Sequence, residues 1–314
     1  MVPILDNKKS LVPIFYNSIE VKIEKRIRKI LGNGRIKKNK TVVNLSPLLR
    51  NYLNSLIYNN NTSLKSIIIA SPGRLNLLVR WMKIFNPQFL DKDNEDSIIL
   101  YNIFVEHGYD IIDKFSFVNN LKIDTCVYCN RNYIFSISKK KVVKAEIDHF
   151  YPKSIYPLLA LSYYNLIPSC ESCNGLGAKG SKDPYFEGLK NPYLINYDDF
   201  KFTFKIKNIS IINPICGKSD IEVEFKDKIQ SHCDVFNLDD LYSLHHDHAI
   251  ELVIKQRLKY SKKYRSYLNS YDGLTFNKSE IDRMILGNYS LESEQHKRPL
   301  SKLYQDIGKE LGLI

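Results

Sequence analysis

The 314-residue sequence lacks any long run of apolar residues and any motif that binds a nucleotide. No window approaches the roughly 18 uncharged apolar residues of a membrane-spanning helix, so no membrane association is expected. The first residues, MVPILDNKKSLVPIFYNS, contain an early acid, two prolines and no apolar core long enough for a secretory signal. The stretch SPGRLN is not followed by Gly-Lys-Ser/Thr and is not a phosphate-binding loop. We therefore expect a cytoplasmic protein without an ATP site of its own.

Positive charge is abundant. The chain has 46 Lys and Arg against 34 Asp and Glu, a net charge of +12. Such an excess is typical of proteins with a polyanionic partner such as nucleic acid. The sequence is also rich in Lys, Asn and Ile throughout, a bias that a genome's base composition can produce without any partner. The charge leaves both explanations open.

Hydrophobic periodicity predicts an α+β protein in three parts. Residues 1–120 form a mainly helical region, 121–190 a compact core, and 191–314 a mixed region of strands and then helices. In the first part, apolar residues at helical spacing predict helices over Leu45–Asn59, Gly73–Phe85 and Glu95–Phe115, with Ser46 as the N-cap of the first.

The core and the third part contain the predicted strands. The runs NYIFSIS (132–138) and KVVKAEIDHF (141–150) indicate a β-hairpin, and SCESCN indicates a turn that leads into a short helix begun by Asn174. In the third part, DFKFTFKIKNISII and DIEVEFKD alternate like strands. Helices follow, one of them capped by Asn237 or Asp239, and the chain ends in a short amphipathic helix.

Four of the six cysteines lie in the core as two CxxC pairs, Cys126 with Cys129 and Cys170 with Cys173. Cysteines of an intracellular protein are more often metal ligands or free thiols than disulfides. Two CxxC turns complete a tetrahedral zinc site with bonds of about 2.3 Å, and four protein ligands make such a zinc structural. Coincidental core cysteines or a redox dithiol are the alternatives. Cys216 and Cys233 lack a CxxC partner and are interpreted as ordinary thiols.

Polar residues of chemical interest lie between or beside the cysteine pairs. Asp148 and His149 end an apolar run in EIDHFYPKS, Asn165 follows sixteen residues after His149, and Asn174 comes directly after the last cysteine. Each has a structural explanation when taken alone: a turn acid for Asp148, and turn or cap residues for the two asparagines. Neutral histidine is a suitable general base near pH 7. Neighbouring residues of a strand point to opposite sides, so a bend at the strand end would aim His149 at a water and Asp148 at an ion.

The motifs DHFYPKS, YNLIPSC, CESCN and GAKGSK resemble the HNH, or ββα-metal, nuclease family. The amino-acid sequence of the segment also resembles that of the nuclease component of Septu-type anti-phage systems and of related bacterial HNH proteins. The resemblance covers about 65 residues, from Cys126 to Pro184 and slightly beyond. It implies a zinc-braced ββα core, with His149 as general base and Asn165 orienting His149 or its loop. It also implies that Asp148 and Asn174 hold a catalytic divalent ion.

The family often has His where this chain has Asn174, and oxygen ligands favour Mg²⁺ or Mn²⁺. Basic side chains beside the motif are either phosphate contacts or solvated surface: Arg131, Lys153, Lys179 and Lys182. His245 and His248 in HHDH are one helical turn apart, and we interpret them as part of a polar helix face rather than as a second metal site.

The expected function is metal-dependent hydrolysis of phosphodiester bonds in nucleic acid, with DNA favoured and RNA possible. By resemblance, the setting is anti-phage defence and a separate ATPase subunit would fit as a partner. Two alternatives are a non-catalytic zinc module that binds nucleic acid and a protein-interaction subunit in which the core is only a scaffold.

Overall fold

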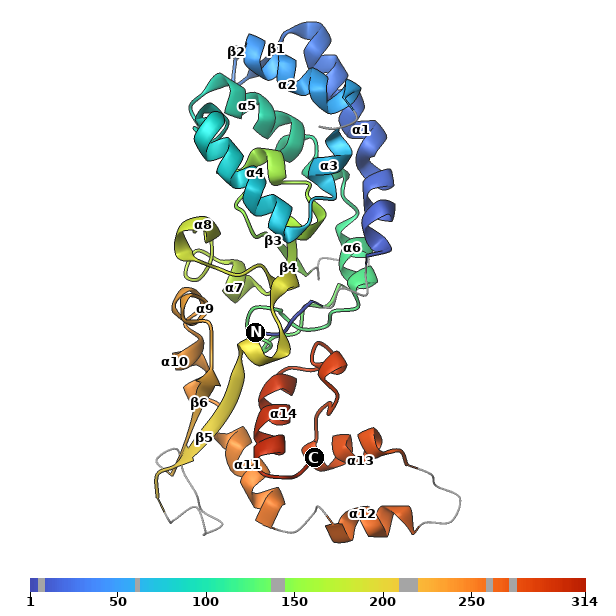
Figure 1. Cartoon of the computed structure of the whole chain (residues 1–314), viewed down its shortest axis with the longest axis vertical. Coiled ribbons are helices and arrows are strands. Elements are labelled where there is room, and N and C mark those ends of the chain that lie inside the picture. The colour runs from blue at the N-terminus through green and yellow to red at the C-terminus, as the bar shows by residue number, and fades with distance from the viewer. Residues whose placement is uncertain (5–8, 60–62, 137–144, 209–219, 258–261, 271–275) are drawn as a thin grey trace.

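A computed structural model describes residues 1–4, 9–59, 63–136, 145–208, 220–257, 262–270 and 276–314. The fold is mixed α+β and mostly helical. In these ranges the strands form two-stranded antiparallel sheets, β1–β2, β3–β4 and β5–β6. Along the long axis of the molecule the N-terminal helices lie at one end, β3, β4 and α7 near the middle, and the C-terminal elements at the other end (Figure 1). The fold class predicted from the periodicity is confirmed at this coarse level.

The N-terminal region is built around the long helix α1, whose apolar face is buried against α2, α3 and the β1–β2 hairpin. The predicted helices over 45–59 and 73–85 are confirmed as α2 and α4. Ser46 caps α2 as expected, because its Oγ accepts a hydrogen bond from the Leu49 N–H at 3.0 Å. The elements are α1 (Leu11–Asn33), β1 (Arg35–Lys38), β2 (Thr41–Asn44), α2 (Pro47–Tyr58), α3 (Leu64–Ile68), α4 (Pro72–Phe85), α5 (Glu95–Tyr101) and α6 (Lys114–Leu121).

The single helix predicted over Glu95–Phe115 is wrong. The α-helix ends at Tyr101, a π-helical turn, η3 (Asn102–Glu106), follows, and a short 3₁₀ turn precedes α6. Gly108 lies at this break, where an added Cβ would come within 2.5 Å of the Phe104 carbonyl oxygen. The close approach of the backbone to the preceding turn requires glycine at this position.

The middle region consists of β3 (Glu146–His149), β4 (Leu166–Ser169), α7 (Glu171–Asn174) and α8 (Pro184–Glu187). The predicted partner of β3 is corrected: β3 pairs with β4, with His149 opposite Leu166. The residues of the expected hairpin at 137–144 lie outside the described ones, and in 132–136 the only ladder contact is an isolated bridge from Tyr133 to Thr125. The short helix after β4 is confirmed, but Asn174 ends it instead of beginning it.

The C-terminal region begins with the predicted strands, confirmed as β5 (Lys201–Ile206) and β6 (Ile221–Asp227). The helices of this region are α9 (Gln230–Phe236), α10 (Leu238–Ser243), α11 (His246–Arg257), α12 (Lys262–Asn269), α13 (Lys278–Leu286) and α14 (Ser301–Glu310). Of these helices, α10, α11 and α14 pack on the hairpin. Asn237 precedes α10 in a left-handed conformation but makes no side-chain cap. The final helix, α14, is confirmed, and its polar residues from Ser301 to Asp306 are also buried, with Lys302 paired to Asp306 at 2.8 Å.

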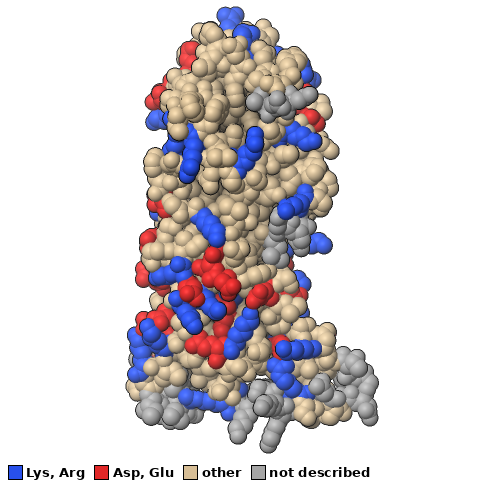
Figure 2. All heavy atoms as spheres, in the orientation of Figure 1, with Lys and Arg blue, Asp and Glu red and all other residues tan. Residues whose placement is uncertain are grey.

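The N-terminal end of the chain meets the middle region. Val2 donates its N–H to the Val127 carbonyl at 3.1 Å, and Met1 and Val2 are buried. On the face shown in Figure 2, Asp and Glu side chains gather most densely in the lower half, among Lys and Arg. The net positive charge therefore does not form one uniform basic surface there, and an anion site has to be argued from local residues.

Candidate zinc centre and candidate active site

The four cysteines predicted as ligands come together. All of Cys126, Cys129, Cys170 and Cys173 are buried, and their sulfur atoms all lie within 4.8 Å of one another. The Sγ atoms of Cys129 and Cys170 are 3.9 Å apart. A tetrahedral ion with bonds of about 2.3 Å would separate its sulfurs by about 3.8 Å. This buried cluster can hold a metal ion such as zinc.

The chemistry of the cluster also fits a cation. Burial raises the pKa of the Cys126 thiol well above its ordinary value, since a thiolate loses its hydration there. Adjacent buried thiols therefore ionise together only if a cation compensates them. Hydrogen bonds to sulfur support thiolates: Arg131 N–H donates to Cys129 Sγ at 3.4 Å, and Asn132 Nδ2 donates to Cys170 Sγ at 3.3 Å.

Distant segments hold the first CxxC loop in place. Asn130 has a left-handed φ of 51° and lies between Cys129 and Arg131. Its Nδ2 donates to Thr125 Oγ1 and to the Gln295 carbonyl, and its own carbonyl accepts from the N–H of Leu300. The cysteine cluster thus lies where the middle and C-terminal regions join.

Asp148 lies behind the CxxC loop, with only 3% of its surface exposed. Its Oδ2 accepts a hydrogen bond from the Tyr128 hydroxyl at 2.6 Å, and its Oδ1 is 2.9 Å from Lys179 Nζ. Lys179, fully buried, also donates to the His149 carbonyl at 2.8 Å. Tyr128 separates Cys126 from Cys129 in the CVYC loop, so this cluster links the cysteine site to the end of β3.

Asp148, one of the two predicted ion ligands, does not fit a divalent cation as arranged. Both carboxylate oxygens of Asp148 have donors, and an ammonium group already supplies the positive charge. Asn174 donates from Nδ2 to Glu146 Oε2 at 2.8 Å, a bond that does not involve the amide oxygen predicted as the ligand atom. No reaction step is therefore assigned to an ion held by Asp148 and Asn174.

His149 faces the opposite way from Asp148, as the strand alternation predicts. Its Nε2 lies 3.1 Å from the Ala160 carbonyl, and its ring packs against Tyr109 with centroids 4.7 Å apart. A proton on Nε2 satisfies that carbonyl and leaves the Nδ1 lone pair to accept one. Burial, with a smaller contribution from Lys153, lowers the pKa of His149 to about 3 and keeps the imidazole neutral.

Asn165 holds the loop that begins after His149. Its Oδ1 accepts from the Tyr151 N–H at 2.7 Å, and its Nδ2 donates to the carbonyls of Tyr151 and Leu159 at 3.1 and 2.9 Å. Leu159 directly precedes Ala160, whose carbonyl faces the His149 ring. The contacts are those expected of a residue that orients the histidine's loop.

Two basic side chains lie beside the ring of Tyr109, which packs against His149. Lys153 Nζ lies 4.5 Å and Lys114 Nζ 3.9 Å from the centre of the Tyr109 ring, so two cations stand close to the imidazole. Lys153 was predicted from the motif. Lys114 and Tyr109 were not, because they lie outside the motif and only the fold brings them to it.

The other predicted phosphate contacts have different environments. Lys182 is exposed, as a phosphate contact requires. Lys179 is completely buried and is hydrogen-bonded to Asp148 and to the His149 carbonyl, so it is not placed to contact a phosphate. Arg131 donates from Nε to His245 Nε2 at 2.8 Å, which joins the core to the segment before α11.

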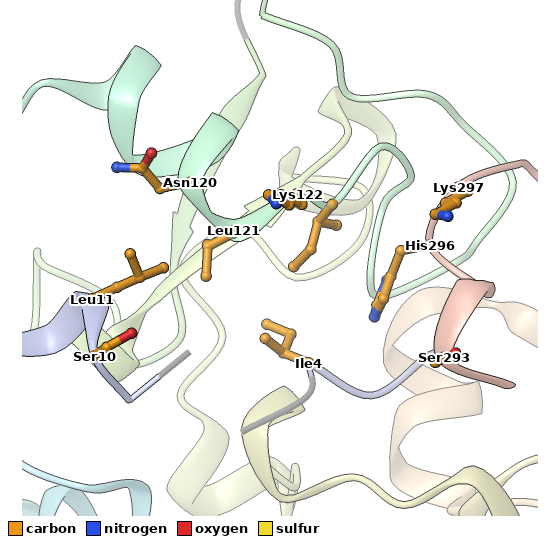
Figure 3. A pocket seen from close by; sticks show the side chains of 10 residues that line it. Ile4, Ser10, Leu11, Asn120, Leu121, Lys122, Ser293, His296 and Lys297 are labelled. Atoms are coloured by element: carbon orange, nitrogen blue, oxygen red, sulfur yellow. The ribbon is translucent and has the colours of Figure 1, made fainter. Parts of the chain in front are cut away.

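Two further features lie outside this site. His245, Asp247 and His248 have possible ligand atoms within 4.8 Å of one another, but Arg131 already occupies His245 Nε2. A cavity of about 390 Å³ lies where the N-terminal segment, the end of α6 and the C-terminal region meet, with Leu121 and His296 among its lining residues (Figure 3). No predicted site residue lines it.

Cys233 is buried in α9, apart from the cluster, and Cys216 lies outside the described residues. Within the described parts of the chain, none of the helices combines the length and the hydrophobicity needed to cross a lipid bilayer.

Comparison with known proteins gives one partial similarity. The chain is 39% identical over 67 residues to the Septu protein PtuB of Bacillus thuringiensis, a match that covers 21% of this chain and 23% of the relative. No family model matches the chain, and no solved structure matches it. The similarity supports a relationship with a Septu-type defence protein.

Proposed function

We propose that this protein is an HNH-type endonuclease that hydrolyses phosphodiester bonds with His149 as the general base. The observation that carries the proposal is the local construction around His149. A β-hairpin, β3–β4, leads directly into a short helix that bears the second CxxC pair. The histidine at the end of β3 is fixed in one orientation by Ala160 and by a loop that Asn165 holds.

The chemistry follows from that geometry. With its Nε2 proton on the Ala160 carbonyl, His149 can take a proton from a water at Nδ1 while that water attacks the phosphorus atom. Charge develops on the phosphate oxygens as the bond to the leaving oxygen breaks. We assign the stabilisation of that charge to Lys153 and Lys114, whose ammonium groups lie beside Tyr109. A bound phosphate would also raise the pKa of His149 towards neutrality, because an adjacent anion favours the imidazolium.

The proposed zinc ion at the four cysteines is structural. It would fix the CVYC loop and, through the Tyr128 hydroxyl, the position of Asp148. Asp148 and Lys179 are then positioning residues: Lys179 spans the Asp148 carboxylate and the His149 carbonyl and so fixes the end of β3.

The proposed setting is anti-phage defence, on the strength of the similarity to a Septu protein. We propose DNA as the first substrate, with RNA as the alternative, and a separate ATPase subunit as a partner. The net charge of +12 is consistent with a nucleic-acid substrate.

One observation favours a second candidate, a non-catalytic zinc-containing subunit that binds nucleic acid or protein. Asp148 is closed off by Tyr128 and Lys179, and His149 has only 6% of its surface exposed. If this candidate is right, the hydrogen bonds of Asp148 with Tyr128 and Lys179 only stabilise the core.

The test is cleavage by the wild type and by His149→Ala of plasmid DNA, single-stranded DNA and RNA, each with Mg²⁺ and with EDTA. The proposal predicts cleavage of at least one substrate by the wild type alone or with its partner, and its loss in the variant. Equal cleavage by both proteins would rule out His149 as the base, and no cleavage by either under all conditions would favour the second candidate. The EDTA arm separately shows whether a divalent ion is required.

A further inference from the structure

A cavity in the N-terminal region is lined by basic side chains from three segments. Arg26 and Lys29 come from α1, Arg35 and Lys37 from β1, and His107 from the residue after η3. The cavity has a volume of about 450 Å³, within the range of about 300–1,000 Å³ typical of ligand sites. Ile30, Asn33, Ile36 and Asn102 complete the lining, which includes no acid.

In the described parts of the chain, these cations form no ion pair with a carboxylate. Among the described residues, no ion pair joins Arg26, Lys29, Arg35 or Lys37 to an acid. Glu106, the acid that acts on Arg26 through space, is occupied by Lys38 at 3.5 Å and by Asn102 Nδ2 at 2.6 Å.

Arg26 is the innermost of the group. Its Nη2 donates to Asn102 Oδ1, whereas its Nε is buried and has no hydrogen-bond partner among the described residues. Like charges that converge without counter-charge repel one another, and a buried donor without a partner is costly. An anion with several acceptor oxygens would relieve both.

We propose that this basic pocket (Arg26, Lys29, Arg35, Lys37 and His107) binds clustered phosphate groups. Guanidinium and ammonium groups converging from two elements match a ligand with several oxyanions better than a single carboxylate. Such phosphates have two sources: the polyphosphate of a small molecule, or consecutive phosphates of a nucleic-acid backbone.

The pocket is joined to the candidate active site by a short piece of chain. His107 lines the pocket, and Tyr109, two residues later, packs on His149. Two residues span at most about 7 Å. A bound phosphate group would therefore lie against the segment that positions Tyr109. The site itself does not depend on the proposed function, because its ligand chemistry holds whether or not His149 is catalytic.

The test compares two double variants with the same change of charge. Lys29→Gln with Lys37→Gln removes two exposed cations from the pocket, and Lys22→Gln with Lys25→Gln removes two exposed lysines of α1 that do not line it. Binding is measured for inorganic triphosphate by calorimetry and for a short labelled DNA duplex by fluorescence anisotropy, without added divalent cations and over a range of salt concentrations. Circular dichroism confirms that both variants are folded.

We expect the pocket variant to weaken binding by about tenfold or more, and the control variant to have little effect. For the duplex, loss of two phosphate contacts should reduce the salt slope by about 1.8. Loss of triphosphate binding alone identifies a small polyphosphate, and loss of duplex binding, with or without triphosphate, identifies the nucleic-acid backbone. The proposal is overturned if the wild type binds neither ligand, if the pocket variant binds like the wild type, or if the control variant loses as much affinity as the pocket variant.

Discussion

At the scale of single residues, the candidate site depends on charges that are buried in pairs. Asp148 and Lys179 are almost inaccessible to water, and Lys179 also donates to the carbonyl of His149, the residue after Asp148 in β3. Removal of one partner leaves an uncompensated charge, which is far more costly than removal of both. A buried positioning pair is therefore recognised by a large loss of stability when one partner is removed, whereas removal of an exposed phosphate contact leaves stability nearly unchanged.

We therefore predict that Lys179→Met lowers the free energy of unfolding by about 3–5 kcal/mol. Lys179→Met combined with Asp148→Asn should cost clearly less than the sum of the two single changes, because the pair is lost together. Urea unfolding of the four proteins measures the coupling. Lys182→Met, at an exposed lysine nearby, is the control and should change stability by less than about 0.5 kcal/mol. Additive effects at Lys179 and Asp148 would show that the two do not act as a pair.

A second prediction concerns His232, buried in α9. Burial lowers its pKa to about 3, whereas in the unfolded chain it is about 6.5. Between these values the unfolded chain binds a proton that the folded protein does not. Its contribution to stability is therefore complete above pH 6.5 and is lost as the pH falls towards 3, with a slope of up to about 1.4 kcal/mol per pH unit.

His232→Phe should reduce that slope whatever its effect on absolute stability, because phenylalanine does not titrate. Denaturant unfolding at several pH values between 4 and 8 measures it. The same pH dependence in the variant and the wild type would mean that His232 is protonated equally in both states.

At the scale of elements, the loop between β3 and β4 decides where His149 points. Asn165 makes three buried hydrogen bonds to the backbone of that loop. We predict that Asn165→Ala costs about 2–4 kcal/mol, since several backbone groups lose their partner, and that it slows any cleavage that depends on His149. Thermal unfolding and the cleavage assay report the two effects. Asn119→Ala, at an exposed asparagine of α6, is the control; equal effects at both positions would exclude an orienting role for Asn165.

Local patterns predicted the elements whose signals are local. Helix α2 was predicted with its Ser46 cap, and β5 and β6 by their alternation, because periodicity and capping depend on nearby residues. The partner of β3 was missed because β4 lies beyond a loop, and pairing over that distance leaves no local signal. The helix break before Gly108 was missed for a similar reason: the residues around it are apolar at helical spacing, and only packing shows the π turn.

The sequence predicted some residues of the candidate site but not the contacts between them. The cysteine spacing indicated which residues come together, and they do. The partners of Asp148 were not predictable, because Tyr128 and Lys179 reach it from different loops of the fold. Tyr109 and Lys114, which border His149, come from a region with no recognisable motif.

At the scale of the whole molecule, the cysteine cluster is the point where the regions join. The first residues of the chain, the β3–β4 hairpin and the segment before α14 all contact the first CxxC loop or its neighbours. Loss of a metal there should therefore affect the whole fold rather than one loop.

We predict that the wild type is purified with about one zinc ion per chain and that Cys170→Ser loses both the zinc and much of the stability, because metal binding is coupled to folding. Metal analysis and thermal unfolding measure the two. Cys233→Ser is the matched control, a buried cysteine outside the cluster, and should retain the zinc. A folded, zinc-free Cys170→Ser protein as stable as the control would contradict a structural role for the metal.

The most direct test of the account is the cleavage rate of His149→Ala beside His246→Ala, a histidine of α11 outside the site, on the substrate that the wild type cuts. Loss of a general base is expected to slow cleavage by about 10²–10⁴-fold, while His246→Ala cuts like the wild type and both variants remain folded. A folded His149→Ala protein that cleaves at the wild-type rate would contradict the assignment of His149 as the base.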